Sequence, residues 1–119
     1  MTSTLKSRAA TLTMVIDQGA DFNPYLPWKD SSGSYFNLTS YTGTITIKDA
    51  STGATIDTWT SGADEIVFGT GDTNIQIVIA DTVTADYDFT TANYDFFIID
   101  TLGDKRLLLT GQMTLNRSV

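Results

Sequence analysis

The sequence predicts an all-β protein, an antiparallel sandwich of two sheets with seven to eight short strands. Apolar and polar residues alternate with a period of two along most of the chain, which is the pattern of strands with one buried face. Turn clusters rich in Gly, Asp, Ser and Thr recur about every 8–12 residues, as in sandwiches and barrels rather than in alternating strands and helices. Thr accounts for 21 of the 119 residues, and its β-branched side chain suits the solvent face of a sheet.

The N-terminal third contains one clear strand and one weak strand. Residues 10–16 alternate regularly and place three apolar side chains, those of Leu12, Met14 and Ile16, on one face. The segment 20–30 contains two prolines, and proline cannot donate a hydrogen bond within a sheet. We therefore expect an edge strand or a broken strand in this segment.

Five later runs continue the alternation, and each places its apolar residues on one face. They are residues 41–49 with Ile45 and Ile47, residues 54–59 with Ile56 and with Trp59 just out of register, residues 74–81 with Ile75, Ile77 and Ile79, residues 93–100 with Tyr94, Phe96 and Ile98, and residues 106–115 with Leu107, Leu109, Met113 and Leu115. The Gly-rich run 69–74 predicts a hairpin turn. Only residues 80–87 could form a helical turn, a short connector capped by Asp81.

The length of the chain corresponds to one ordinary domain that can bury a core without disulfides. Residues 1–8 are polar and basic and predict a flexible N-terminal arm, so residues 9–119 are expected to form a single β-sandwich domain. No apolar run has the roughly 20 residues of a membrane span, and the N-terminus lacks the apolar core of a signal peptide. We expect a protein that is made in a cytoplasm and has no membrane partner.

The charge distribution disfavours nucleic acid as a partner. The chain has 7 basic and 14 acidic residues and a net charge of −7. Nine carboxylates lie between Asp64 and Asp104, and no Lys or Arg accompanies them. Such a surface repels phosphate backbones.

Few residue types in the chain are suited to catalysis. Without Cys or His there is no thiol or imidazole nucleophile, no disulfide and no ordinary zinc site. Asp72 in the Gly-rich turn, or Asp86 and Asp88 on either side of Tyr87, could contribute to a Ca²⁺ loop, but the calcium-loop pattern with Glu at its twelfth position is absent. Asp is also a common turn residue. We expect no enzymatic activity, no catalytic residue, no metal and no cofactor.

Aromatic residues are concentrated in the first half of the chain and permit two interpretations. They are Tyr25, Trp28, Tyr35, Phe36, Tyr41 and Trp59. Aromatic side chains form interfaces and carbohydrate platforms, but they also fill the cores of small sandwiches. For Trp28 and Phe36 we favour core packing. Tyr25 stands next to a proline and Tyr35 stands in a turn, so these two are the candidate surface contacts.

The order of these signals resembles that of a known family. The residues that carry the resemblance are Trp28-Lys29-Asp30 before a Gly turn, Asn37-Leu38-Thr39-Ser40-Tyr41, Tyr94-Asp95-Phe96, Gly103-Asp104, Arg106-Leu107-Leu108 and Gly111. In their order and spacing, over about residues 9 to 117, the chain resembles the short β-sandwich proteins that tailed bacteriophages encode among their virion genes. It is also similar to the N-terminal domain of upper baseplate proteins. Ser40 replaces a Gly of the family pattern, and Gly103-Asp104 reverses an Asp-Gly pair.

The resemblance implies an immunoglobulin-like, non-enzymatic structural component of a tailed-phage virion. It would belong to the tail, the baseplate or a fibre attachment, and would contact other virion proteins and copies of itself in a homo-oligomer or ring. A capsid decoration or head-associated protein and a glycan-binding module on a fibre are the alternatives. The segregation of charge adds a hypothesis, in which the basic arm with Lys6 and Arg8 docks on the acidic stretch of a neighbouring subunit.

Overall fold

The computed structural model describes residues 10–117, which form an all-β structure of eight strands with short helical turns between them. The strands are β1 Ala10–Thr11, β2 Met14–Asp17, β3 Thr42–Asp49, β4 Thr55–Thr60, β5 Ile66–Phe68, β6 Ile75–Ile77, β7 Thr91–Ile99 and β8 Lys105–Asn116. The helical turns are η1 Ser61–Ala63, η2 Gly71–Thr73 and α1 Asp81–Thr84. The predicted all-β class and strand number are confirmed. The predicted arm lies outside the described residues.

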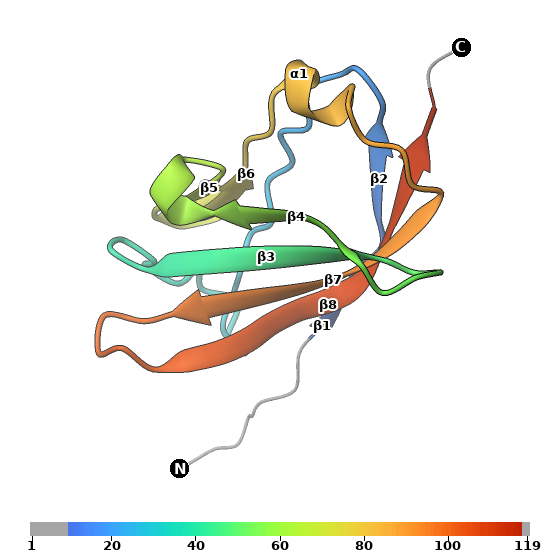
Figure 1. Cartoon of the computed structure of the whole chain (residues 1–119). Helices are drawn as coiled ribbons and strands as arrows, with labels where there is room; N and C mark the ends of the chain where they lie inside the picture. The colour runs from blue at the N-terminus through green and yellow to red at the C-terminus, as the bar shows by residue number, and fades with distance from the viewer. Residues whose placement is uncertain (1–9, 118–119) are drawn as a thin grey trace.

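The larger sheet contains six strands in the order β1-β8-β7-β3-β4, with β2 also paired to β8 (Figure 1). The pairs β8–β7, β7–β3 and β3–β4 are antiparallel, as predicted. The two N-terminal strands differ, because β1 and β2 both run parallel to β8. The sheet is therefore mixed rather than purely antiparallel.

The second sheet contains β5 and β6 and is extended by an irregular segment. Isolated bridges join Phe22 to Ile79 and Tyr25 to Gln76, so residues 22–26 follow β6 without forming a regular strand. Pro24 and Pro27 interrupt this segment, as their lack of an N–H donor predicts. The resulting pairing, with β8, β7, β3 and β4 in one layer and residues 22–26, β6 and β5 in the other, has the strand order of an immunoglobulin-like sandwich.

The core lies between the two layers and is built from the alternating residues of the strands. Its buried apolar members are Met14, Ile16, Leu38, Ile45, Ile47, Trp59, Ile66, Ile75, Ile77, Ile79, Tyr87, Phe89, Ala92, Tyr94, Phe96, Ile98, Met113 and Leu115. Trp59 is fully buried, which removes it from the candidate surface aromatics. Trp28 and Phe36 are half-buried and pack against this core with ring centroids 4.4 Å apart.

Two β-bulges explain where the alternation misleads. Between β3 and β4 the register shifts so that Ile47 faces Asp57 while Lys48 faces Thr55, which leaves Ile56 as the extra residue. Ile56 and Trp59 are three residues apart, so a regular strand would place them on opposite faces. Because of the bulge, the Trp59 side chain nevertheless enters the core.

The second bulge lies between β7 and β8, where Phe96 faces Leu109 but Phe97 faces Leu107. Leu108 is the extra residue of β8. The prediction that Leu107 shares a core face with Met113 is wrong, because the bulge reverses the alternation between them. Leu109 packs against the core as predicted, and Leu108, the extra residue of the bulge, packs there in place of Leu107.

Two smaller predictions also need correction. Leu12 does not belong to the core face of Met14, since the chain leaves regular strand geometry between β1 and β2 and the Leu12 side chain is 37% exposed. Asp81 is the first residue of α1 rather than its cap, and the Asp21 carboxylate accepts a hydrogen bond from the Asp81 N–H at 2.8 Å. No helix in the described part of the chain is long and apolar enough to cross a bilayer.

Replacing Ser40 by Gly is expected to stabilise the fold. Ser40 is left-handed, with φ of 71°, at the position where the resembled family has Gly. A side chain in this conformation costs roughly 1–2 kcal/mol, and the greater freedom of Gly in the unfolded chain offsets part of that gain. We expect Ser40→Gly to raise the free energy of unfolding by about 0.5–1 kcal/mol in urea denaturation.

Ser34→Gly is the matched control, because Ser34 lies in a nearby exposed turn without a positive φ. This control should be neutral or slightly destabilising. An equal gain from both substitutions would contradict the backbone explanation.

Candidate interaction groove

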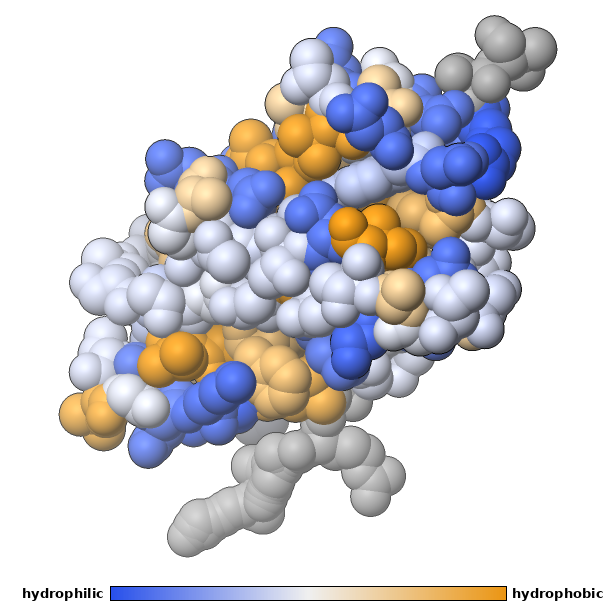
Figure 2. Space-filling view, viewed as in Figure 1, coloured by the Kyte–Doolittle hydropathy of each residue, from blue (hydrophilic) through white to orange (hydrophobic). Residues whose placement is uncertain are grey.

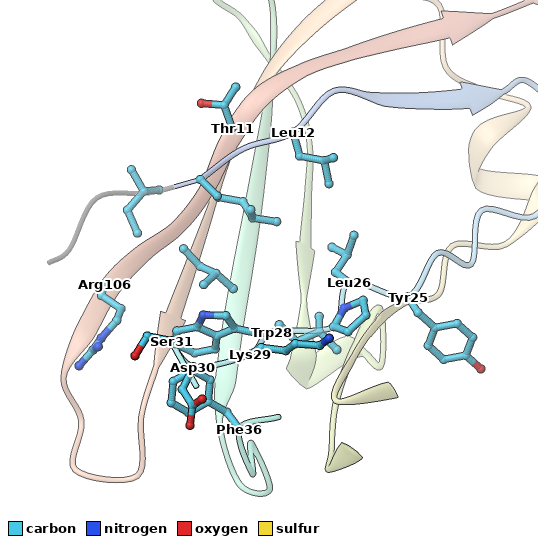
Figure 3. Close-up of a pocket in the computed structure, with 16 residues that line it drawn as sticks. Thr11, Leu12, Tyr25, Leu26, Trp28, Lys29, Asp30, Ser31, Phe36 and Arg106 are labelled. Atoms are coloured by element: carbon cyan, nitrogen blue, oxygen red, sulfur yellow. The ribbon is translucent and has the colours of Figure 1, made fainter. Parts of the chain in front are cut away.

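A groove of about 1300 Å³ lies between the irregular segment 25–31 and the strands β1 and β8 (Figure 3). Most of its lining is apolar. The lining residues are Ala10, Thr11, Leu12, Tyr25, Leu26, Pro27, Trp28, Lys29, Asp30, Ser31, Phe36, Ile75, Arg106, Leu107, Leu108 and Leu109. This concave and mostly apolar surface is the candidate functional site.

The groove exists because regular pairing ends on both of its sides. On one side, the prolines prevent residues 25–31 from forming a continuous strand. On the other side, β1 pairs only with Leu109 and Thr110 of β8. Within residues 10–117, no strand pairs with Lys105–Leu108 on the edge of β8 that faces away from β7.

Asn74 fixes the wall formed by Trp28 and Phe36. It is fully buried, and its side-chain oxygen accepts a hydrogen bond from the Trp28 N–H at 2.9 Å. Its side-chain amide donates to the carbonyl oxygens of Trp28 at 2.8 Å and Phe36 at 3.0 Å. One side chain therefore binds three backbone groups of a segment that has only isolated bridges, although the Trp28 carbonyl oxygen also accepts from the Phe36 N–H at 3.1 Å. No sequence pattern marks Asn74 as a site residue, because it stands at the end of a Gly-rich turn, where Asn is common.

Charged side chains border the groove on both of its walls. Lys29 and Asp30 are neighbours on one wall, and on the other wall Arg106 lies 3.9 Å from the Asp100 carboxylate. The Asp30 carboxylate accepts hydrogen bonds from the Ser32 hydroxyl and from the backbone N–H groups of Ser32 and Ser34. The Ser32 hydroxyl and these N–H groups hold the pKa of Asp30 below its usual value. Asp30 therefore closes its own turn and is not free to receive a partner.

Only two of the four predicted contact residues, Tyr25 and Tyr35, belong to the described part of the chain. Lys6 and Arg8 lie outside the described residues. Tyr25 is 54% exposed and borders the groove, but its ring points away from the other lining side chains (Figure 3). Tyr35 is 39% exposed and its ring lies 4.8 Å from the Lys29 ammonium group, outside the lining of the groove. The predicted exposure of both tyrosines is confirmed.

Apolar side chains reach the surface outside the groove as well. Figure 2 shows apolar surface on one face of the molecule, including the end of the β7–β8 hairpin, where Leu102 is 86% exposed. Val15, Val67 and Val78 are exposed on other elements. Scattered apolar residues of this kind are normal on protein surfaces, whereas a contiguous apolar groove indicates an interaction site.

A buried polar network lies on the opposite side of the core. The Tyr87 hydroxyl donates to the Asp57 carboxylate at 2.5 Å and accepts from the Trp59 indole N–H at 2.9 Å. Burial, followed by the hydrogen bond to Asp57, raises the pKa of Tyr87 well above its ordinary value. Each polar group is satisfied within the network, so its role is to fix β4 to the segment before β7.

The stability of the fold is expected to fall in alkaline solution. Burial raises the pKa of Tyr94 from 10.0 to about 12, and it raises that of Tyr87 further. Because the folded-state pKa values exceed the unfolded value, the folded state disfavours ionisation, and stability present below pH 10 is lost as the pH rises from 10 towards 12. Urea denaturation across this range, with tyrosinate absorbance recorded in parallel, should show the loss.

Tyr94→Phe provides the comparison for this prediction. The variant should be less stable at neutral pH, since the Tyr94 hydroxyl donates to the Leu12 carbonyl at 2.6 Å. It should then lose less stability than the parent chain above pH 10. Identical alkaline slopes for both chains would contradict the assignment to Tyr94.

The described residues contain no group of three or more carboxylates arranged to hold a metal ion. Of the candidates for a Ca²⁺ loop, Asp72 lies in η2, whereas Asp86 and Asp88 lie in the segment after α1. Asp88 pairs with Arg117 at 2.6 Å. The run 69–74 forms the turn between the antiparallel strands β5 and β6, as predicted. It contributes no residue to the groove.

Comparison with known proteins shows no family. No family model matches the chain, and no curated protein matches it. Among solved structures, the extracellular domain of the voltage-gated sodium channel β4 subunit, described as parallel homodimers that explain its role in cell–cell adhesion, is similar over 98% of this chain and 100% of that chain, with 12% identity and a TM-score of 0.46. At this level the similarity carries no conclusion about binding.

Proposed function

We propose that this chain is a non-enzymatic structural module of a tailed-phage virion, in the tail, the baseplate or a fibre attachment, and that it acts by contacts with other virion proteins and with copies of itself. The phage context comes from the resemblance in the order of turns and strands. The observation that carries the structural role is the groove. Its walls are mostly apolar. Its charged groups contact neighbouring residues, with Asp30 in its own turn, Lys29 over the Tyr35 ring and Arg106 at 3.9 Å from Asp100.

A groove of this kind suits a polypeptide better than a small reactive substrate. General acid–base or nucleophilic chemistry needs a titratable group aimed at a bound molecule. Here Asp30 is bound within its own turn, and Lys29 lies over the ring of Tyr35. The apolar side chains on both walls can instead bury those of a binding partner.

Protein composition of purified particles tests the proposal. Purified particles of the phage that encodes this chain can be analysed by mass spectrometry. We expect the chain to be present at a defined copy number, a multiple of three, five or six. Labelling with gold or a small tag would then separate tail and baseplate positions from a capsid decoration. Absence of the chain from purified particles would overturn the structural role.

The proposed docking of the basic arm can be tested independently. Lys6 and Arg8 would contact the acidic stretch between Asp64 and Asp104 of a neighbouring subunit, and complementary charges mainly set register and association rate. Removing residues 1–8 should slow assembly into rings or onto particles, and added salt should reduce the difference between the two chains. Equal incorporation of the shortened and full-length chains would contradict this contact.

One observation favours a second candidate function, binding of a glycan on a fibre. Tyr25 borders the groove and is 54% exposed, which is the arrangement of an aromatic sugar platform. A glycan array probed with the full chain and with the Tyr25→Ala variant tests whether the chain binds a glycan through Tyr25. Binding that Tyr25→Ala abolishes would favour this candidate, and absence of binding would remove it.

A further inference from the structure

We propose that the groove receives an extended segment of a different protein, which adds as a β-strand to the free edge of β8 and places apolar side chains against Trp28 and an acidic side chain near Arg106. The inference goes beyond the proposed function, since strand addition does not require the partner to be a virion protein. Three features support it: the unpaired strand edge, the apolar wall and the local charge.

The strand edge supplies the backbone contacts. β8 is twelve residues long, but on the side away from β7 only its central and C-terminal parts pair with β1 and β2. The N–H and C=O groups of Lys105–Leu108 on this side have no strand partner among residues 10–117. An extended peptide that pairs with such an edge gains main-chain hydrogen bonds in register.

The facing wall supplies the side-chain contacts. Leu26, Trp28 and Phe36 lie opposite Leu108 and Leu109 across the groove. Figure 3 shows Trp28 and Phe36 together on this wall, with Arg106 on the β8 side. Because alternate side chains of a strand point to one face, a partner strand on β8 would direct every second side chain against this wall.

Charge selects the kind of segment. The described part of an acidic chain has five basic residues, Lys29, Lys48, Lys105, Arg106 and Arg117. Lys29 and Arg106 line the groove, and Lys105 is adjacent to Arg106. The acidic groups nearby are committed, with Asp30 in its own turn and Asp100 accepting from the N–H groups of Leu102 and Asp104. Among residues 10–117, Lys29 and Lys105 have no carboxylate within ion-pair distance and lie over aromatic rings instead. Arg106 reaches the Asp100 carboxylate only at 3.9 Å. An acidic side chain on the partner would therefore meet cations that no close carboxylate neutralises.

The N-terminal residues of the same chain, or of a second copy, fit this edge less well. Ala10 pairs with Leu109 in parallel register. A strand continuing in that register would set Lys6 opposite Lys105 and Ser7 opposite Arg106, so that like charges meet. The same edge favours a segment with the opposite charge, and hence a different protein.

Synthetic peptides can test strand addition with the full-length chain. The probe is an acetylated, amidated eight-residue peptide, TVTLTVTD, and its matched controls are TVTLTVTK and a form of the probe that is N-methylated at its two central residues. Amide correlation spectra would follow the backbone signals of Lys105–Leu108 and the indole signal of Trp28. We expect saturable shifts of these signals with the probe, about fivefold weaker binding of the lysine peptide, and loss of binding with the methylated peptide.

Arg106→Glu tests the charge without disturbing the core, because the Arg106 side chain is 57% exposed. This variant should prefer the lysine peptide, whereas Lys48→Glu, an exposed change outside the groove, should leave the preference unchanged. Equal binding of the methylated and unmethylated probes, or of the acidic and basic peptides, would overturn the proposal.

Two further outcomes would name another occupant. Tighter binding of a peptide with the sequence of residues 1–9, MTSTLKSRA, would assign the groove to the N-terminal segment. Shifts of the same β8 signals with protein concentration alone would assign it to a second copy. Either result would contradict a separate acidic partner.

Discussion

Asn74→Ala is expected to lower the free energy of unfolding by about 3 kcal/mol, and to loosen the groove before the rest of the fold unfolds. The substitution removes three part-buried hydrogen bonds of a fully buried side chain, to the N–H and C=O of Trp28 and to the C=O of Phe36. The Trp28 carbonyl keeps one donor, the Phe36 N–H, whereas the Trp28 N–H loses its acceptor. Leaving a buried backbone group unsatisfied costs roughly 1–3 kcal/mol, and water that enters from the groove would reduce the total. Urea denaturation monitored by far-UV circular dichroism measures the global effect.

The local effect has its own readout. Trp28 and the fully buried Trp59 give two indole N–H signals, and only that of Trp28 should shift or broaden in the Asn74 variant under native conditions. Asn93→Ala is the matched control, because Asn93 is exposed on β7 and surface changes usually alter stability by less than about 0.5 kcal/mol. Equal losses from the two substitutions would contradict the role of Asn74.

Much of the fold could be predicted from the sequence because burial imposes a period of two on each strand. The three isoleucines Ile75, Ile77 and Ile79 are buried as the alternation indicates, and so are Tyr94, Phe96 and Ile98. A bulge has no comparable signal, because it adds one residue to a strand whose partner is distant in sequence. This is why the burial of Trp59 in the same core as Ile56, and the orientation of Leu107 away from that core, have no signal in the alternation. The parallel pairing of β1 and β2 with β8 likewise depends on contacts between the two ends of the chain.

The candidate groove was only partly predictable for a similar reason. Pro24 and Pro27 indicate a broken strand, and that break forms one wall. The other wall comes from β1 and from β8, and the β8 residues of the lining are about 80 residues away from the broken strand in the sequence. Trp28 was assigned to the core, and it does pack there, but the same side chain also lines the groove. A half-buried aromatic residue can have both roles, and alternation cannot separate them.

Gly111→Ala is expected to destabilise the fold by about 3 kcal/mol and to weaken the pairing of the N-terminal strands. A Cβ atom at this position would lie 2.2 Å from the Leu12 carbonyl oxygen and 3.0 Å from its carbonyl carbon. These are backbone atoms, so no side-chain rotation relieves the contact and the segment between β1 and β2 must move. The Leu12 carbonyl also accepts the Tyr94 hydroxyl at 2.6 Å, and displacing it leaves that buried hydroxyl unsatisfied. The steric overlap and the lost buried hydrogen bond together account for the expected loss of about 3 kcal/mol.

Gly62→Ala is the matched control for this close approach. A Cβ at Gly62 would meet nothing within 4 Å, and its φ is not left-handed, so this change should be neutral or slightly stabilising. In hydrogen exchange, the Gly111 variant should lose protection at the amide of Leu12, which donates to Thr110 at 3.1 Å, before β3 and β7 lose theirs. A Gly111→Ala variant as stable as the parent would show that the segment between β1 and β2 can move away from β8 at little cost in free energy. Because Leu12 also lines the groove, that result would make this wall adaptable, and the shape of the groove would then follow the segment that binds it.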